Sequence, residues 1–164
     1  AFNCAKDTES LYSLVKPKGN TLSRLSTGEK KWFTTVLALF AKTEVTLLDE
    51  PLEDLDPALV KYLINAITTA KGKQILITLH NVYLLKYFKD WDLFFMFDGN
   101  LYGKAKVEDV LNSCIVLGDK ENAVLKLNVG GSTYSIVKGN YEGGISLKEI
   151  NNIDILYDRL RMET

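Results

Sequence analysis

Two neighbouring carboxylates, Asp49 and Glu50, stand directly after the short apolar run 45–48. An apolar strand that ends in Asp-Glu is the pattern of a nucleotide-hydrolysis site, where the aspartate helps to hold Mg²⁺ and the next carboxylate orients or deprotonates the attacking water. Negative charge at the end of a buried strand is costly unless a metal ion and phosphates compensate it. Solvated turns explain most such acidic strand ends, so the pattern alone is weak.

A histidine follows the next apolar run of the chain. His80 comes after the predicted strand 74–79. In an open α/β sheet, ligands bind beyond the carboxyl ends of the strands. We therefore expect Asp49, Glu50 and His80 to lie together at one edge of the sheet. A single histidine in this place is more often structural than catalytic, so the expectation depends on the combination.

A third group of polar residues, LSTGE at positions 25–29, precedes both strands. Ser26 followed three residues later by Glu29 is a capping-box pattern, in which each side chain bonds the backbone of the other. Apolar residues at helical spacing follow, so the sequence predicts a helix from near Ser26 to about Ala41. By itself, this spacing indicates a helix cap more often than a phosphate site.

The remaining elements follow from periodicity and from turn residues. The sequence predicts helices at 8–16, 57–71, 81–89, 107–111 and from Ser146 onward, with buried strands at 45–48 and 74–79. It also predicts a hairpin around Asp98-Gly99 and a strand pair at 124–129 and 133–137. Strand–helix alternation over residues 1–112 indicates a layered α/β domain with parallel strands, and residues 113–164 read as a small α+β appendage.

Composition argues against a nucleic-acid-binding protein, a disulfide-rich protein and a membrane-spanning protein. The 164 residues are 46% apolar and carry a formal net charge of −1, so no strong field favours nucleic acid or an anionic membrane. Cys4 and Cys114 fit no metal-ligand spacing, and a disulfide scaffold is not expected. No apolar run approaches the roughly 20 residues of a membrane helix. The first residues show no signal-peptide pattern, and they lack an initiator Met.

Taken in order, these groups resemble the motifs of the ATP-binding-cassette (ABC) ATPases. Residues 25–29 resemble the ABC signature, and residues 45–50 resemble the Walker B motif. Residues 53–56 resemble the D-loop, and His80 resembles the switch histidine. The resemblance covers roughly residues 22–112, and the spacing from signature to Walker B is similar to that of transporter ATPases.

The resemblance implies a partial P-loop-NTPase fold and a set of roles. Two ATPase domains would sandwich ATP head to tail, with the signature helix facing the γ-phosphate through its N-terminal N–H groups. Glu50 and His80 would be catalytic, and Asp49 would hold Mg²⁺. The residues implied to contact ATP or the dimer partner are Leu25, Ser26, Thr27, Gly28, Glu29, Asp54 and Asp56.

Two departures from the family pattern qualify these roles. The phosphate-binding pattern GxxxxGK[ST] occurs nowhere in the sequence, so the chain resembles the C-terminal part of such a domain. We expect the isolated chain to bind ATP weakly or not at all and to be inactive. Thr27 stands where the family usually has a second glycine, and a β-branched residue restricts the backbone there.

The function implied is that of an ATP-hydrolysing subunit of an ABC transporter, which energises transport through ATP-driven dimer closure. It would act at the cytoplasmic face of the membrane with a second ABC domain and a membrane-spanning subunit, and no direct nucleic-acid partner is expected. Two alternatives stay open: an SMC-like or DNA-repair ABC ATPase, and a non-catalytic module that completes the ATP site of a partner.

Overall fold

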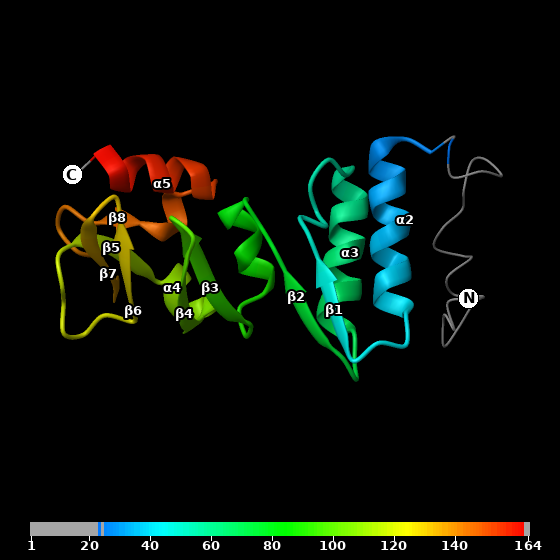
Figure 1. Ribbon diagram of the computed structural model, residues 1–164, viewed down its shortest axis with the longest axis horizontal. Coiled ribbons are helices and arrows are strands. Elements are labelled where there is room, and N and C mark those ends of the chain that lie inside the picture. The colour runs from blue at the N-terminus through cyan, green and yellow to red at the C-terminus, as the bar shows by residue number, and fades with distance from the viewer. Residues whose placement is uncertain (1–22, 24, 163–164) are drawn as a thin grey trace. The chain divides into compact units, whose positions relative to one another are not determined.

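A computed structural model of the chain describes Ser23 and residues 25–162. The predicted helix at 8–16 lies outside the described residues. The chain divides into two compact units, 1–79 and 80–164, and each is considered by itself (Figure 1). The sequence-based division into 1–112 and 113–164 stays a prediction.

The described part of the first unit is a parallel strand pair with two helices. Its elements are α2 (Thr27–Phe40), β1 (Val45–Leu48), α3 (Pro57–Thr69) and β2 (Gln74–Ile77). β1 and β2 run parallel, with Val45 beside Gln74 and Leu48 beside Ile77. Because the strands are parallel and in register, their carboxyl ends meet at the same edge, as the α/β prediction requires.

Local signals start both helices. The capping box at Ser26 opens α2. Asp56 caps α3 by accepting a hydrogen bond from the Ala58 amide at 2.8 Å, and Pro57 takes the first helical position. The apolar faces of these helices form the core of the unit, which includes Trp32, Val36, Leu39, Leu63, Ile64 and Ile67.

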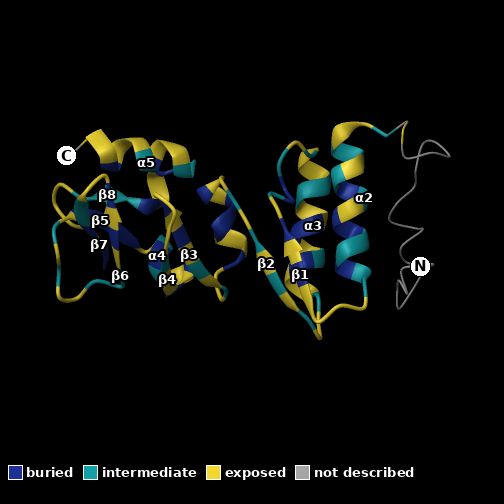
Figure 2. Ribbon diagram, in the orientation of Figure 1, coloured by how far each residue is buried: buried dark blue, intermediate teal, exposed yellow. Residues whose placement is uncertain are grey.

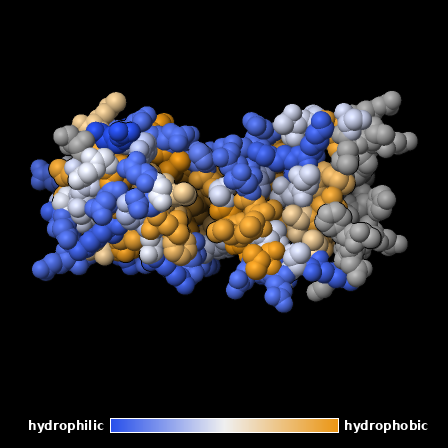
Figure 3. All heavy atoms as spheres, viewed as in Figure 1, coloured by the Kyte–Doolittle hydropathy of each residue, from blue (hydrophilic) through white to orange (hydrophobic). Residues whose placement is uncertain are grey.

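β1 is buried on one face only, and the residues of β2 are exposed or partly exposed, so the prediction of two buried strands is wrong. Leu48 is 6% exposed, whereas Leu47 is 70% and Leu76 is 59% exposed. Both helices lie on the same side of the pair, so they cover only alternate side chains (Figures 1 and 2). The uncovered side chains form an apolar area over β1 and β2 (Figure 3).

The second unit is built around antiparallel strands. Its elements are η2 (Val82–Tyr87), β3 (Asp92–Phe97), β4 (Asn100–Lys106), α4 (Val107–Leu111), β5 (Ser113–Leu117), β6 (Leu125–Val129), β7 (Ser132–Lys138), β8 (Ile145–Ser146), η3 (Leu147–Glu149) and α5 (Ile153–Met162). β3 and β4 form the predicted hairpin. The other four strands form one sheet in the order β6-β7-β5-β8.

This unit differs from the sequence-based expectation in three places. The helix predicted at 81–89 is a 3₁₀ helix over Val82–Tyr87. Strand β5 was not predicted, because four of its five residues are buried and it therefore shows no alternation. The last helix begins at Ile153 rather than at Ser146, since Ser146 pairs with Cys114 in the sheet and one 3₁₀ turn follows. No helix among the described residues is both long and apolar enough to cross a bilayer.

Candidate functional site

The two strand ends of the first unit are joined by one hydroxyl group. The Thr78 amide donates to the Leu48 carbonyl at 3.0 Å, which extends the strand pairing past β2. The Thr78 hydroxyl donates to Asp49 Oδ1 at 2.6 Å and accepts from the Glu50 amide at 2.9 Å. Asp49 is exposed and Glu50 is partly exposed. The predicted acidic pair is therefore held at the carboxyl edge of the sheet and faces solvent.

The backbone after β1 takes an uncommon conformation. Glu50 has a φ of 44° and Asp54 a φ of 58°, both in the left-handed region that favours glycine. Such residues cost on the order of 1–3 kcal/mol each, and they concentrate at functional sites. Both outliers fall on predicted site residues, which favours a functional reading of the turn 49–54.

The predicted signature segment forms the capped beginning of α2. Ser26 Oγ accepts from the Glu29 amide at 3.2 Å, and Glu29 Oε2 accepts from the Ser26 amide at 2.8 Å. The capping box predicted from the sequence is thus confirmed. Thr27 is exposed as the first residue of the helix, and Leu25 is partly exposed just before it.

Gly28 brings the start of α2 against the turn 49–54. A Cβ atom on Gly28 would lie 2.8 Å from the Asp54 carbonyl oxygen, a distance that real Cβ atoms essentially never show. Only glycine allows this approach, so the residue is required by packing within the unit as well as by the predicted nucleotide role. The contact places two predicted ligand-binding segments, 25–29 and 53–56, side by side.

The remaining predicted site residues have structural partners of their own. Asp56 is exposed and caps α3. His80 belongs to the second unit, where its Nδ1 lies 3.7 Å from Asp154 Oδ2 and its carbonyl accepts from the Ile153 amide at 2.9 Å. The clustering of His80 with Asp49 and Glu50 therefore stays a prediction.

Sequence reasoning did not select Thr78, although it joins both carboxylate residues. The available signal was a hydroxyl residue at the end of the second apolar run, one strand away from Asp-Glu. Because adjacent parallel strands end at the same edge, such a residue is within reach of the acidic pair.

The donor set of this edge suits Mg²⁺ shared with a nucleotide. Mg²⁺ is usually bound through one or two carboxylates together with substrate phosphates and water. Asp49 supplies one carboxylate that Thr78 orients. Within residues 25–162, no group of three or more His, Cys, Asp or Glu side chains could hold a metal by itself. The residues therefore fit a shared magnesium ion rather than a separate metal centre.

Known proteins match the chain across this region. The family model described as "AAA domain, putative AbiEii toxin, Type IV TA system" matches residues 18–86. A "Putative ABC transporter ATP-binding protein" of Caldanaerobacter subterraneus subsp. tengcongensis is 28% identical over 120 residues, which are 72% of this chain and 47% of that protein.

A solved structure adds a likeness in three dimensions. The crystal structure of a "putative Cobalt transport ATP-binding protein (cbiO-2)" matches with a TM-score of 0.79 and 28% identity, and the match covers 91% of this chain and 57% of that one. The chain thus spans about half the length of the relatives that it matches. Sequence and fold together support a likeness of this chain to the nucleotide-binding domains of the ABC ATPases.

Proposed function

We propose that the chain is the part of an ABC transporter ATPase that supplies the hydrolytic carboxylates and the signature helix. The observation that carries the proposal is the Thr78 link, which holds Asp49 and Glu50 together at the carboxyl edge of β1 and β2. The close approach of Gly28 to Asp54 supports it, because it places a helix N-terminus next to the same turn.

Each residue of this edge has a proposed task. When bound, ATP with Mg²⁺ supplies the phosphoryl group that is attacked. Asp49 would hold the magnesium ion, and Glu50 would orient or deprotonate the attacking water. The N-terminal N–H groups of α2, at Ser26 to Glu29, would stabilise phosphate charge at the site of a partner domain. His80 would contact the γ-phosphate, and Asp54 and Asp56 would connect the two domains.

The proposal includes partners outside this chain. The sequence has no GxxxxGK[ST] loop, so the lysine and amide cradle for the phosphates would come from other sequence. The names of the relatives support an ATP-binding protein of a transporter. As the family resemblance implies, the chain would work in a dimer of ABC domains with a membrane-spanning subunit, at the cytoplasmic face. ATP-driven closure of the dimer would energise transport.

The capped beginning of α2 also suits a second candidate function. A non-catalytic module could use its signature helix to complete the ATP site of a partner without contributing a base of its own. The two candidates differ in whether hydrolysis depends on Glu50.

Mixing the purified chain with the GxxxxGK[ST]-bearing part of an ABC domain, which ends before its own Walker B carboxylates, tests both candidates. We expect ATP hydrolysis in the mixture to fall about 100-fold or more with Glu50→Gln, because general-base contributions have that size. Glu44→Gln is the matched control, since Glu44 stands at the opposite end of β1, and it should leave the rate unchanged. Hydrolysis that needs the chain but is insensitive to Glu50→Gln would support the module instead.

The isolated chain provides a separate measurement. In a calorimetric titration of the chain alone we expect no binding of MgATP in the micromolar range, since the phosphate cradle is absent from its sequence. Micromolar affinity would contradict the proposed division of the site between sequences.

A further inference from the structure

The second unit contains a pocket that none of the predicted ATP-site residues lines. Its volume is about 370 Å³, and its walls come from η2, α4, η3 and residues 150–151. The Val82 amide donates to the Asn151 carbonyl at 2.9 Å, and the Glu108 amide donates to the Lys89 carbonyl at 3.1 Å. These backbone bonds join the walls across the pocket, so its shape is set by packed elements.

Part of the pocket lining is apolar. Val82, Leu147 and Ile150 line it and are only 5%, 1% and 2% exposed. They are part of the core of the unit and are held in place by it. A volume near the lower end of the 300–1,000 Å³ typical of small-molecule sites limits a ligand to the size of a substituted ring or a short chain.

Positive charge surrounds this lining. Lys86, Lys89 and Lys148 line the pocket, and Glu108 is the carboxylate among the lining residues. Among the residues that the structure describes, neither Lys89 nor Lys148 forms an ion pair, and Glu108 forms none either. Three cations against one anion leave an excess of about two positive charges facing the pocket.

One of these cations is held by aromatic rings. Lys86 Nζ lies 3.5 Å from the centre of the Tyr83 ring, which also lines the pocket, and 5.0 Å from the centre of the Tyr87 ring. A side-chain hydrogen bond with Tyr83 raises the pKa of Lys86 above its usual value of 10.5. The ammonium group of Lys86 therefore stays charged at neutral pH. The ammonium group is therefore positioned at the pocket without being neutralised by a carboxylate.

We propose that this pocket binds a small organic dianion with an apolar body, such as an aryl phosphomonoester. Two negative charges match the excess of positive charge, and the apolar body covers Val82, Leu147 and Ile150. The site is separate from the proposed ATP site and does not depend on it, because the two share no residue.

Calorimetric titration of the full chain with phenyl phosphate at low ionic strength tests the proposal. We expect saturable one-to-one binding that is tighter than for inorganic phosphate, which lacks the ring, and than for benzyl alcohol, which lacks the charge. Affinity should fall as salt is added, since exposed charges are screened. Equal affinity for phenyl phosphate and inorganic phosphate would overturn the role of the apolar lining.

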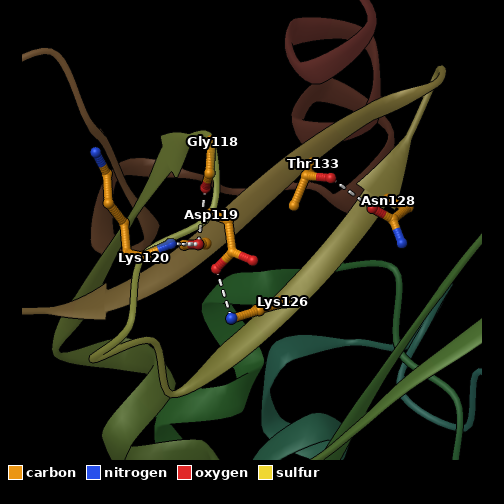
Figure 4. Close-up of polar contacts among 7 residues, drawn as sticks. Gly118, Asp119, Lys120, Lys126, Asn128 and Thr133 are labelled. Carbon is orange, nitrogen blue, oxygen red and sulfur yellow. Dashed lines mark hydrogen bonds and ion pairs between the residues drawn. The ribbon is translucent and has the colours of Figure 1, made fainter.

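Variants locate the binding. Lys86→Gln combined with Lys148→Gln should weaken phenyl phosphate binding roughly tenfold or more, the size expected for lost charge-assisted contacts. Glu108→Gln should tighten it, because it removes the negative charge of the lining. Lys126→Gln is the matched control, since Lys126 lies on β6 outside the pocket and pairs with Asp119 (Figure 4).

All of the substituted side chains are exposed, so the variants should fold, and their urea midpoints check this. Phenyl phosphate should bind more weakly to the lysine double variant and more tightly to Glu108→Gln. Together with an unchanged affinity in Lys126→Gln, this distinguishes a specific site from general attraction to a charged surface. The proposal would be overturned if the lysine double variant bound phenyl phosphate as tightly as the parent chain. It would also be overturned if Lys126→Gln lost as much affinity for phenyl phosphate as the lysine double variant.

Discussion

At the scale of single residues, the end of α2 depends on a side chain from another part of the sequence. Lys73 Nζ donates to the carbonyl oxygens of Leu39 and Ala41, both at 2.7 Å, and lies 3.3 Å from that of Ala38. The last carbonyls of a helix have no partner within it, and they carry the negative end of its dipole. α2 has no basic residue in its own last turn, so Lys73 supplies the missing charge and donors.

Replacing Lys73 with methionine tests this cap. Lys73→Met retains the apolar stem and removes the ammonium group, and we expect the free energy of unfolding to fall by about 1–2 kcal/mol, since Lys73 is partly exposed. Urea denaturation of the full chain measures the change. Lys71→Met alters an exposed lysine two positions earlier and should cost less than about 0.5 kcal/mol. Equal effects of the two variants would contradict the capping role.

At the scale of elements, one carboxylate joins α5 to two turns. The Tyr157 hydroxyl of α5 donates to Asp98 Oδ1, and the Gly130 amide donates to Asp98 Oδ2 at 3.2 Å. The Tyr157 ring also stacks on Phe97, with ring centres 5.8 Å apart. The β3–β4 turn, the β6–β7 turn and the last helix therefore meet at Asp98.

These bonds shift two pKa values in opposite directions. The Tyr157 hydroxyl, followed by the Gly130 amide, lowers the pKa of Asp98 below its usual 3.8. The bond to Asp98 raises the pKa of Tyr157 above its usual 10.0. The contribution of Asp98 to stability is present above its unfolded-state pKa and is lost as pH falls through its lowered value. The contribution of Tyr157 to stability is fully present below pH 10.0, its usual pKa. This contribution is lost as pH rises through the raised pKa of Tyr157 in the folded chain.

Tyr157→Phe removes the hydroxyl and retains the ring. We expect the variant to be less stable than the parent chain by a constant amount from about pH 5 to pH 9, with a difference that shrinks in more acidic and more alkaline solution. Urea midpoints of the variant and the parent chain, measured from acidic to alkaline pH, give the difference in stability at each pH. Tyr141→Phe removes an exposed hydroxyl in the same unit and should show no such profile. A difference independent of pH would show that the bond to Asp98 is not its cause.

At the scale of the whole molecule, each compact unit has a core of its own. Leu63 of α3 and Leu127 of β6 are both 0% exposed, and they belong to different units. Stability in such a chain need not be uniform, because separate cores can open at different free energies.

Matched substitutions in the two cores test this independence. Leu63→Ala and Leu127→Ala should each lower the free energy of unfolding of the affected unit by about 2–5 kcal/mol. Amide hydrogen exchange of the full chain separates the units. Leu63→Ala should reduce protection in α3 and β2 and spare β6 and β7, and Leu127→Ala should do the reverse. Loss of protection throughout the chain in both variants would indicate a single cooperative core.

The sequence by itself determined the features whose partners lie within a few residues. Ser26 with Glu29, Asp56 with Pro57, and the turn Asp98-Gly99 each bring their own local geometry, so the starts of α2 and α3 and the β3–β4 hairpin were predictable. The order of these motifs also indicated a resemblance to the ABC ATPases, which the similar proteins support. Ser146 was a misleading signal, because pairing in the sheet outweighed its capacity to begin a helix.

Only the tertiary structure decided the contacts between distant parts of the chain. Asp49 and Thr78 are 29 residues apart, and Lys73 caps a helix 34 residues earlier at Leu39. The burial of β5 and the approach of Gly28 to Asp54 likewise depend on which elements pack together. Local patterns fix the backbone conformation of short segments, but the partners of a side chain follow from packing, which no short stretch of sequence specifies.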